Sequence, residues 1–101
     1  MPAVAVCTVD TISTGHLCDA TALIQGAIQT KVTIGGKPVA IQGDAIAPHT
    51  ILSGSSCVPH AAVINAGSTK VFVGGIPIAR VGDSADLGAI ISGSSKVSAG
   101  G

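Results

Sequence analysis

The chain has 101 residues, with five basic and five acidic side chains and a formal net charge of zero. This length fits a single domain, and the balanced charge argues against a nucleic-acid partner, which would favour a basic surface. The sequence contains no apolar run of the roughly 20 residues that a membrane span needs. No basic segment followed by an apolar run opens the chain, so we expect no secretory signal.

Bulky side chains are almost absent. Apolar residues make up 47% of the sequence, yet there is one Phe and there is no Tyr or Trp, while 14 residues are glycine. A core of Val, Ile, Ala and Gly implies a thin body in which backbone segments lie close together. Because a domain of this size buries only about 60–70% of the surface of its unfolded chain, a metal ion would add appreciably to its stability.

Alternating β-branched residues and closely spaced glycine turns predict an all-β fold. The segment Ala20–Gln29 could be read as a helix, but its Thr, Ile and Gly content favours a loop with a short strand. The predicted strands, in chain order, are Ala3–Val9, Lys31–Ile34, Pro38–Ile41, Lys70–Val73, Ile76–Val81 and Lys96–Ser98.

A repeat organises these strands. KVTIGGKPVAIQGD at 31–44 matches KVFVGGIPIARVGD at 70–83, an offset of 39 residues. Each copy predicts a strand, a Gly-Gly hairpin turn, a proline that opens the next strand, and a Gly-Asp turn. A third copy is split across the termini: KVSAGG at 96–101 continues into MPAVAVCTVD at 1–10, with two extra residues between its proline and its aspartate. We therefore predict a closed, pseudo-threefold domain with adjacent termini, suited to capping a trimer.

The sequence also contains a set of metal-ligand residue types. His49, Cys57 and His60 lie close together in the chain, and His16 lies two residues before Cys18. Three imidazoles and one thiolate suit a single tetrahedral zinc ion, with iron as the alternative. Cys57 is the preferred thiolate, and Cys18 stays open as its rival. With no export signal, reduced thiols or metal ligands are expected rather than a disulfide framework.

Only one copy of the repeat carries these ligands. At the 39-residue offset, Gly88 and Lys96 stand in place of His49 and Cys57, so we expect one ion per chain. A set of four protein ligands leaves no position for water, which favours a structural ion over a catalytic one.

Five further residues have simpler expected roles. Asp19 and Asp44 could orient a ligating imidazole, although the role of a turn residue is favoured for both and for Asp83. Cys7 is expected to pack within a strand. Arg80 is expected to be an exposed strand charge or a polar contact with a partner.

The chain resembles PAAR-repeat proteins, a family named for a Pro-Ala-Ala-Arg motif. That motif stands as PIAR at 77–80, with weaker versions, PVAI at 38–41 and PAVA at 2–5. The resemblance also rests on the Gly-Asp-to-His segment at 43–49 and on CVPH at 57–60, and it covers essentially the whole chain.

The resemblance implies a cone at the tip of the trimeric β-helical spike of a contractile injection machine, such as a type VI secretion system or a phage tail. It further implies a metal near the apex, held by three His and one Cys. Carried over by motif, these ligands are His16, His49, Cys57 and His60.

We accordingly expect residues 1–101 to form one PAAR-type domain with no effector extension, monomeric in isolation and non-enzymatic. The expected partner is a trimeric β-helical spike, with transient contact to a target membrane and no small-molecule substrate. Assembly is expected in the cytoplasm, followed by delivery out of the cell. The alternatives are a small zinc metallohydrolase and a zinc-stabilised adaptor module with an unrelated partner.

Overall fold

The computed structural model describes residues 1–100. These residues form short antiparallel strand pairs and contain no α-helix, so the predicted all-β fold is confirmed. This part of the chain accordingly has no helix that could cross a membrane. The pairs are β1 (Thr11–Ser13) with β2 (Thr21–Leu23), β3 (Thr33–Ile34) with β4 (Lys37–Pro38), β5 (His49–Ser53) with β6 (Ser56–His60), β7 (Phe72–Val73) with β8 (Ile76–Pro77), and β9 (Ser84–Ala85) with β10 (Gly88–Ala89).

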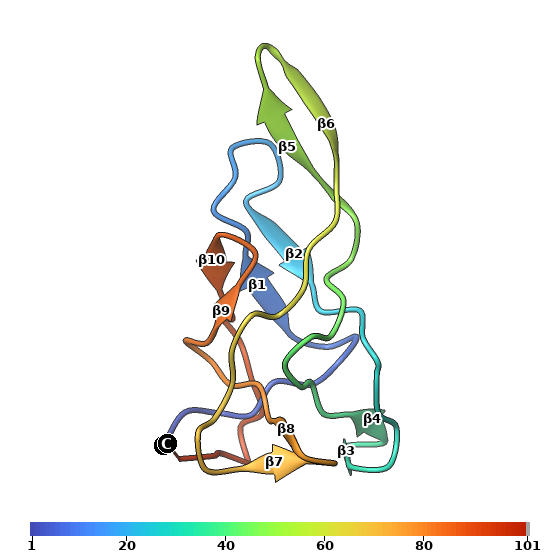
Figure 1. Cartoon of the computed structure of the whole chain (residues 1–101), viewed down its shortest axis with the longest axis vertical. Helices are drawn as coiled ribbons and strands as arrows, with labels where there is room; N and C mark the ends of the chain where they lie inside the picture. Colours follow the sequence, from blue (N-terminus) through green and yellow to red (C-terminus); the bar gives the residue numbers. More distant parts are fainter. Residues whose placement is uncertain (101) are drawn as a thin grey trace.

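The molecule is elongated, with extents of 41 × 23 × 22 Å. Figure 1 shows that it narrows from a broad base, which carries the hairpins β3–β4 and β7–β8, to the single hairpin β5–β6 at the opposite end. The hairpins β1–β2 and β9–β10 lie between these two ends. We call the end formed by β5–β6 the apex.

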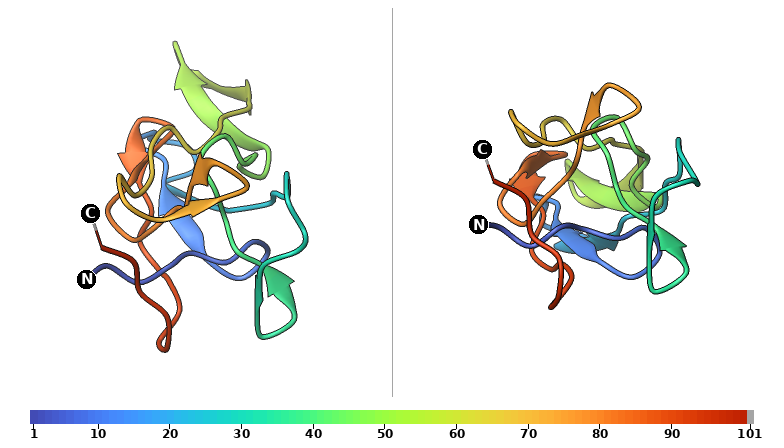
Figure 2. Two further views of the ribbon diagram at one scale, coloured as in Figure 1. Left: turned by 60° about the horizontal axis from the view of Figure 1, so that its bottom comes forward. Right: turned by 90° about the horizontal axis from the view of Figure 1, so that it is seen from below.

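Backbone hydrogen bonds close a three-way ring inside the body. The N–H of Ala5 donates to the carbonyl of Ala79 (3.0 Å), that of Ala79 to Ala40 (2.9 Å), and that of Ala40 to Ala5 (2.9 Å). All three alanines are completely buried. Their small side chains permit the backbones to approach closely. Seen from below, the β3–β4 hairpin, the β7–β8 hairpin and the C-terminal segment radiate in three directions, as Figure 2 shows.

The core beside this ring has the same threefold pattern, with one isoleucine in each of three corresponding positions. Ile24, Ile64 and Ile90 are each 0–1% exposed. Each accepts a backbone hydrogen bond of 2.8–2.9 Å from a turn residue whose φ lies between 62° and 93°. Among the described residues, the buried hydrophobic side chains are Val, Ile, Ala and Cys, with no aromatic ring. Small side chains are sufficient to fill this core because the cross-section of the molecule is narrow.

The split copy has a different register from the one that the sequence comparison gave. The carbonyls of Pro38, Pro77 and Ala3 accept equivalent hydrogen bonds of 2.9 Å. Ala3, and not Pro2, is therefore the counterpart of the two prolines. Because Ala3 is one residue closer to Asp10, one of the two extra residues is accounted for, and the other lies in the turn before Asp10.

Three aspartates close the turns of the ring. Asp10, Asp44 and Asp83 each accept a backbone N–H from three or four residues earlier, at 2.7–2.8 Å. Asp44 is completely buried and also accepts the N–H of Ile28 at 2.8 Å. The favoured role of Asp44 and Asp83 as turn residues is thus confirmed, since the carboxylates of both accept backbone N–H groups of their own turns rather than bonding an imidazole.

Cys7 is the free thiol of this core. Its side chain is buried and its sulfur lies 3.7 Å from a carboxylate oxygen of Asp44. Burial first, and then the charge and hydrogen bond of Asp44, raise the pKa of Cys7 to about 12. The thiol therefore stays protonated and unreactive at neutral pH. The expected burial of Cys7 is confirmed, but the residue lies in a turn and not in a strand.

The strand predictions were partly wrong. Ala3–Val9 is not a continuous strand but makes isolated bridges from Ala3, Val4 and Val6 to three different segments. This follows from the ring, in which each segment passes its neighbours at single residues. The longest hairpin, β5–β6, was not predicted as strands, because its sequence lacks clear alternation and contains Pro59.

Arg80 was predicted to be exposed and is instead buried, at 8% exposure. Its guanidinium donates to both carboxylate oxygens of Asp83 at 3.0 Å and to the carbonyl of Gly100 at 2.9 Å. Arg80 thus holds Gly100, in the C-terminal part of the split copy, against the copy at 70–83 and closes the ring.

Replacing this arginine should open the ring closure. We expect Arg80→Ala to lower the free energy of unfolding by about 3 kcal/mol, because it leaves the half-buried Asp83 carboxylate without its partner. The free energy of unfolding of Arg80→Lys should lie between those of the wild type and Arg80→Ala, since a lysine keeps the charge but not the forked geometry of the guanidinium. Urea unfolding followed by far-UV circular dichroism measures both, and a stability of Arg80→Ala equal to that of the wild type would contradict this role.

Candidate metal centre

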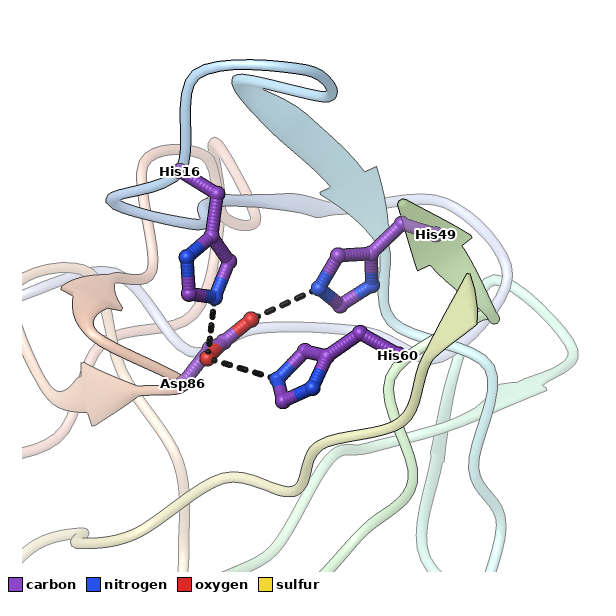
Figure 3. A group of neighbouring side chains, drawn as sticks. All are labelled: His16, His49, His60 and Asp86. Atoms are coloured by element: carbon purple, nitrogen blue, oxygen red, sulfur yellow. Dashed lines mark hydrogen bonds and ion pairs between the residues drawn. The ribbon is translucent and has the colours of Figure 1, made fainter. Parts of the chain in front are cut away.

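The structure brings the three histidines together below the apex. His16 lies in the loop between β1 and β2, His49 begins β5, and His60 ends β6. The ring centroids are 5.9 Å apart for His16 and His49, 5.0 Å for His16 and His60, and 5.1 Å for His49 and His60. Figure 3 shows the three Nε2 atoms converging on one point, which is occupied by the carboxylate of Asp86.

The hairpin β5–β6 positions two of these rings. His49 and His60 are directly opposite each other in its register, so their side chains point to the same face of the hairpin. The Nδ1 atom of His49 lies 2.9 Å from the carbonyl of Ala47. A carbonyl only accepts, so Nδ1 carries a proton and donates, and this bond fixes the orientation of the ring.

Polar contacts hold the β1–β2 loop against the same hairpin. The hydroxyl of Thr14 donates to the carbonyl of Asp19 and accepts the N–H of His16 at 3.1 Å. The carboxylate of Asp19 accepts the N–H and the hydroxyl of Thr50 at 2.7 and 2.8 Å. These two hydrogen bonds, the backbone one first, lower the pKa of Asp19. Asp19 therefore joins the loop that bears His16 to strand β5.

Asp86 comes from the turn between β9 and β10. Its φ of 54° lies in the left-handed region, which Asp tolerates better than most residues. The turn packs closely on β1, since a Cβ at Gly88 would lie 1.8 Å from the carbonyl oxygen of Ser13. The turn also packs on Gly15, where a Cβ would lie 2.9 Å from the backbone of Leu87. The two glycines thus bring Asp86 to the histidines.

The Asp86 carboxylate contacts all three rings. One oxygen lies 2.9 Å from Nε2 of His16 and 3.2 Å from Nε2 of His60, and the other lies 2.7 Å from Nε2 of His49. Burial of the carboxylate favours its protonated form, but the hydrogen bonds from the three imidazoles outweigh burial and lower the pKa of Asp86. The carboxylate is therefore ionised at neutral pH.

These four side chains fit a transition-metal ion. Their ligand atoms, three imidazole nitrogens and one carboxylate oxygen, all lie within 4.8 Å of one another. With Nδ1 of His49 protonated, a neutral His49 has its free lone pair on Nε2, which faces the centre. In the structure this nitrogen lies 2.7 Å from a carboxylate oxygen of Asp86. A donor set of nitrogen and oxygen suits zinc or iron.

The prediction that Cys57 is a thiolate ligand of the metal was wrong. Cys57 is bonded to Cys18 in a disulfide with a Cα–Cα distance of 5.9 Å, so neither sulfur is a free thiolate beside the imidazoles. The expectation of reduced thiols at these two positions was also wrong. The bond forms because the β1–β2 loop, which carries Cys18, lies along β6, which carries the exposed Cys57.

Sequence reasoning missed Asp86. No histidine or cysteine lies near it in the sequence, and it falls outside the repeated segments. A weak signal was present, because Asp86 lies two residues before Gly88, the position that corresponds to His49 at the repeat offset. The approach of the β9–β10 turn to β1, which places the carboxylate, depends on tertiary packing.

Removing the charge of Asp86 tests its contact with the ion. We expect Asp86→Asn to weaken zinc binding by at least about tenfold, since an amide is a poorer ligand than a carboxylate. Competition with a chromophoric chelator measures the affinity. Asp83→Asn is the matched control, because the Asp83 carboxylate pairs with Arg80 rather than with an imidazole, so this variant should keep its zinc affinity within about threefold. An unchanged affinity in Asp86→Asn would limit the ligands to the histidines.

Comparison with known proteins identifies the family of the chain. The family model described as PAAR motif matches residues 14–83 and, in an overlapping second match, 57–101. The chain therefore belongs to the PAAR-motif family, as its sequence resemblance indicated. This is a structural family associated with the spike-tip proteins of contractile injection systems. No curated protein matched the sequence.

Proposed function

We propose that this protein is a non-enzymatic tip that caps the trimeric β-helical spike of a contractile injection system. The observation that carries this proposal is the three-way ring, in which Ala5, Ala40 and Ala79 bond one another in a closed cycle. A single chain with this internal pattern can make three similar contacts with the end of a trimer. Family membership supports the same role.

The base supplies apolar contacts for such docking. Val32, Val71 and Val97 are 44%, 37% and 41% exposed, and they lie at corresponding positions of the three repeats. Their carbonyls accept equivalent hydrogen bonds of 2.9–3.0 Å. Burying three such side chains against a spike would contribute favourably in proportion to the apolar area removed from water.

The apex needs a different source of rigidity. The hairpin β5–β6 has one buried residue, His49, and its other residues are partly or fully exposed. Hydrophobic packing therefore contributes little there. A zinc or iron ion bound by His16, His49, His60 and Asp86 would tie this hairpin to the β1–β2 loop and the β9–β10 turn. We propose that this stiffens the tip when it meets a target membrane, after cytoplasmic assembly and delivery.

A stoichiometry measurement tests the docking. Native mass spectrometry with a soluble trimeric β-helical spike fragment should give one copy of this chain per trimer. Val71→Asp should reduce the bound fraction strongly, because it places a charge in the apolar contact. Leu52→Asp is the matched control, since Leu52 is similarly exposed (44%) but lies on the apex hairpin. Three copies per trimer, or equal loss in both variants, would contradict the proposal.

A further inference from the structure

Three of the four lysines occupy corresponding positions on the base. The backbone N–H groups of Lys31, Lys70 and Lys96 each donate to a side-chain oxygen two residues earlier, at 3.0 Å in every case. Each lysine directly precedes one of the three exposed valines. The fourth, Lys37, lies in β4 and has Ile76 as its counterpart at the repeat offset. We call Lys31, Lys70 and Lys96 the lysine triad.

The charge of the triad is not balanced within the protein. All three lysines are exposed, and no lysine makes an ion pair within residues 1–100. Asp10 and Asp44 are buried in the turns of the ring, and Asp83 is paired with Arg80. Of the two remaining acids, Asp19 bonds Thr50 of the apex hairpin and Asp86 bonds the three histidines. The chain is neutral as a whole, but its base is positively charged.

We propose that the lysine triad recognises a ring of carboxylates, one from each subunit, around an apolar centre on the end of the trimeric spike. This inference rests on the proposed function and specifies the chemistry of the partner. Three cations at corresponding positions match three symmetry-related anions in a way that a single salt bridge would not. Such complementarity selects the partner and fixes the rotational register of docking.

Charge reversal tests the triad against a matched control. The probe is a trimeric β-helical spike fragment with one Asp or Glu per subunit in its terminal coil. Lys70→Glu should weaken binding about tenfold and the triple variant Lys31→Glu/Lys70→Glu/Lys96→Glu about a thousandfold. Lys37→Glu makes the same charge change on the base outside the triad and should weaken binding less than about threefold. Wild-type binding should also weaken as salt is added.

A second probe separates the two proposals. In it the terminal Asp or Glu residues are replaced by Asn or Gln. Weaker binding of the wild type to this amide probe, and no further loss in the triple variant, would support the carboxylate ring. Equal binding of both probes, or equal losses for Lys37→Glu and Lys70→Glu, would overturn the triad and leave spike capping intact. Failure of the wild type to bind either probe would overturn the proposed function itself. Unchanged melting temperatures of the variants exclude misfolding.

Discussion

Removing the metal with a chelator is expected to lower the melting temperature of the protein by at least about 20 °C, because structural zinc contributes folding free energy directly. Without the ion, contacts with the Asp86 carboxylate link the three imidazoles. His49 is then held by its contacts with Asp86 and with the carbonyl of Ala47. The apex hairpin, which has almost no hydrophobic packing, should lose its order first.

The variant His49→Ala separates loss of the ion from other effects of the chelator. It should retain less than about one tenth of the wild-type metal content, measured by elemental analysis, and its melting temperature should no longer respond to chelator or to added zinc. Leu52→Ala is the control, because it changes the same hairpin away from the imidazoles and should keep the metal. Equal metal contents in His49→Ala and the wild type would show that the cluster is not the binding site.

Much of the base was predictable from local sequence. The Gly-Gly turns at 35–36 and 74–75 demand positive φ, and the structure has φ between 59° and 82° at all four glycines. The repeat at the 39-residue offset indicated which segments occupy corresponding places. Turn chemistry and repetition are properties of short stretches of chain, so they can be read without the tertiary structure.

The metal centre was predictable only in part. The three histidines were identified because their residue type is rare in this sequence and typical of metal sites. The choice between Cys57 and Asp86 depended on two approaches between distant segments. One is the β1–β2 loop on β6, which joins the cysteines, and the other is the β9–β10 turn on β1. Neither approach has a local sequence pattern, because each depends on contacts between distant segments: Asp19 with Thr50 for the first, and Gly88 against Ser13 for the second.

Removing the Cys18–Cys57 bond should have the second largest effect. The two cysteines are 39 residues apart, and a cross-link of that span stabilises a protein by about 4 kcal/mol in the chain-entropy treatment. For a chain of this size, we expect Cys18→Ala/Cys57→Ala to melt about 15–30 °C lower than the wild type. Differential scanning calorimetry measures this. A reductant should shift the wild type towards the double variant and leave the double variant unchanged.

The double variant Cys18→Ala/Cys57→Ala also helps to test which side chain completes the proposed metal centre. In the oxidised protein, cobalt added to the site should show no thiolate charge-transfer band, because both sulfurs are in the disulfide and the proposed fourth ligand is the Asp86 carboxylate. Reduction should leave the cobalt spectrum free of that band, and Asp86→Asn should change it. A thiolate band that appears on reduction and is absent from Cys18→Ala/Cys57→Ala would show that a cysteine displaces Asp86. The disulfide would then control the ligand set rather than only the stability of the tip.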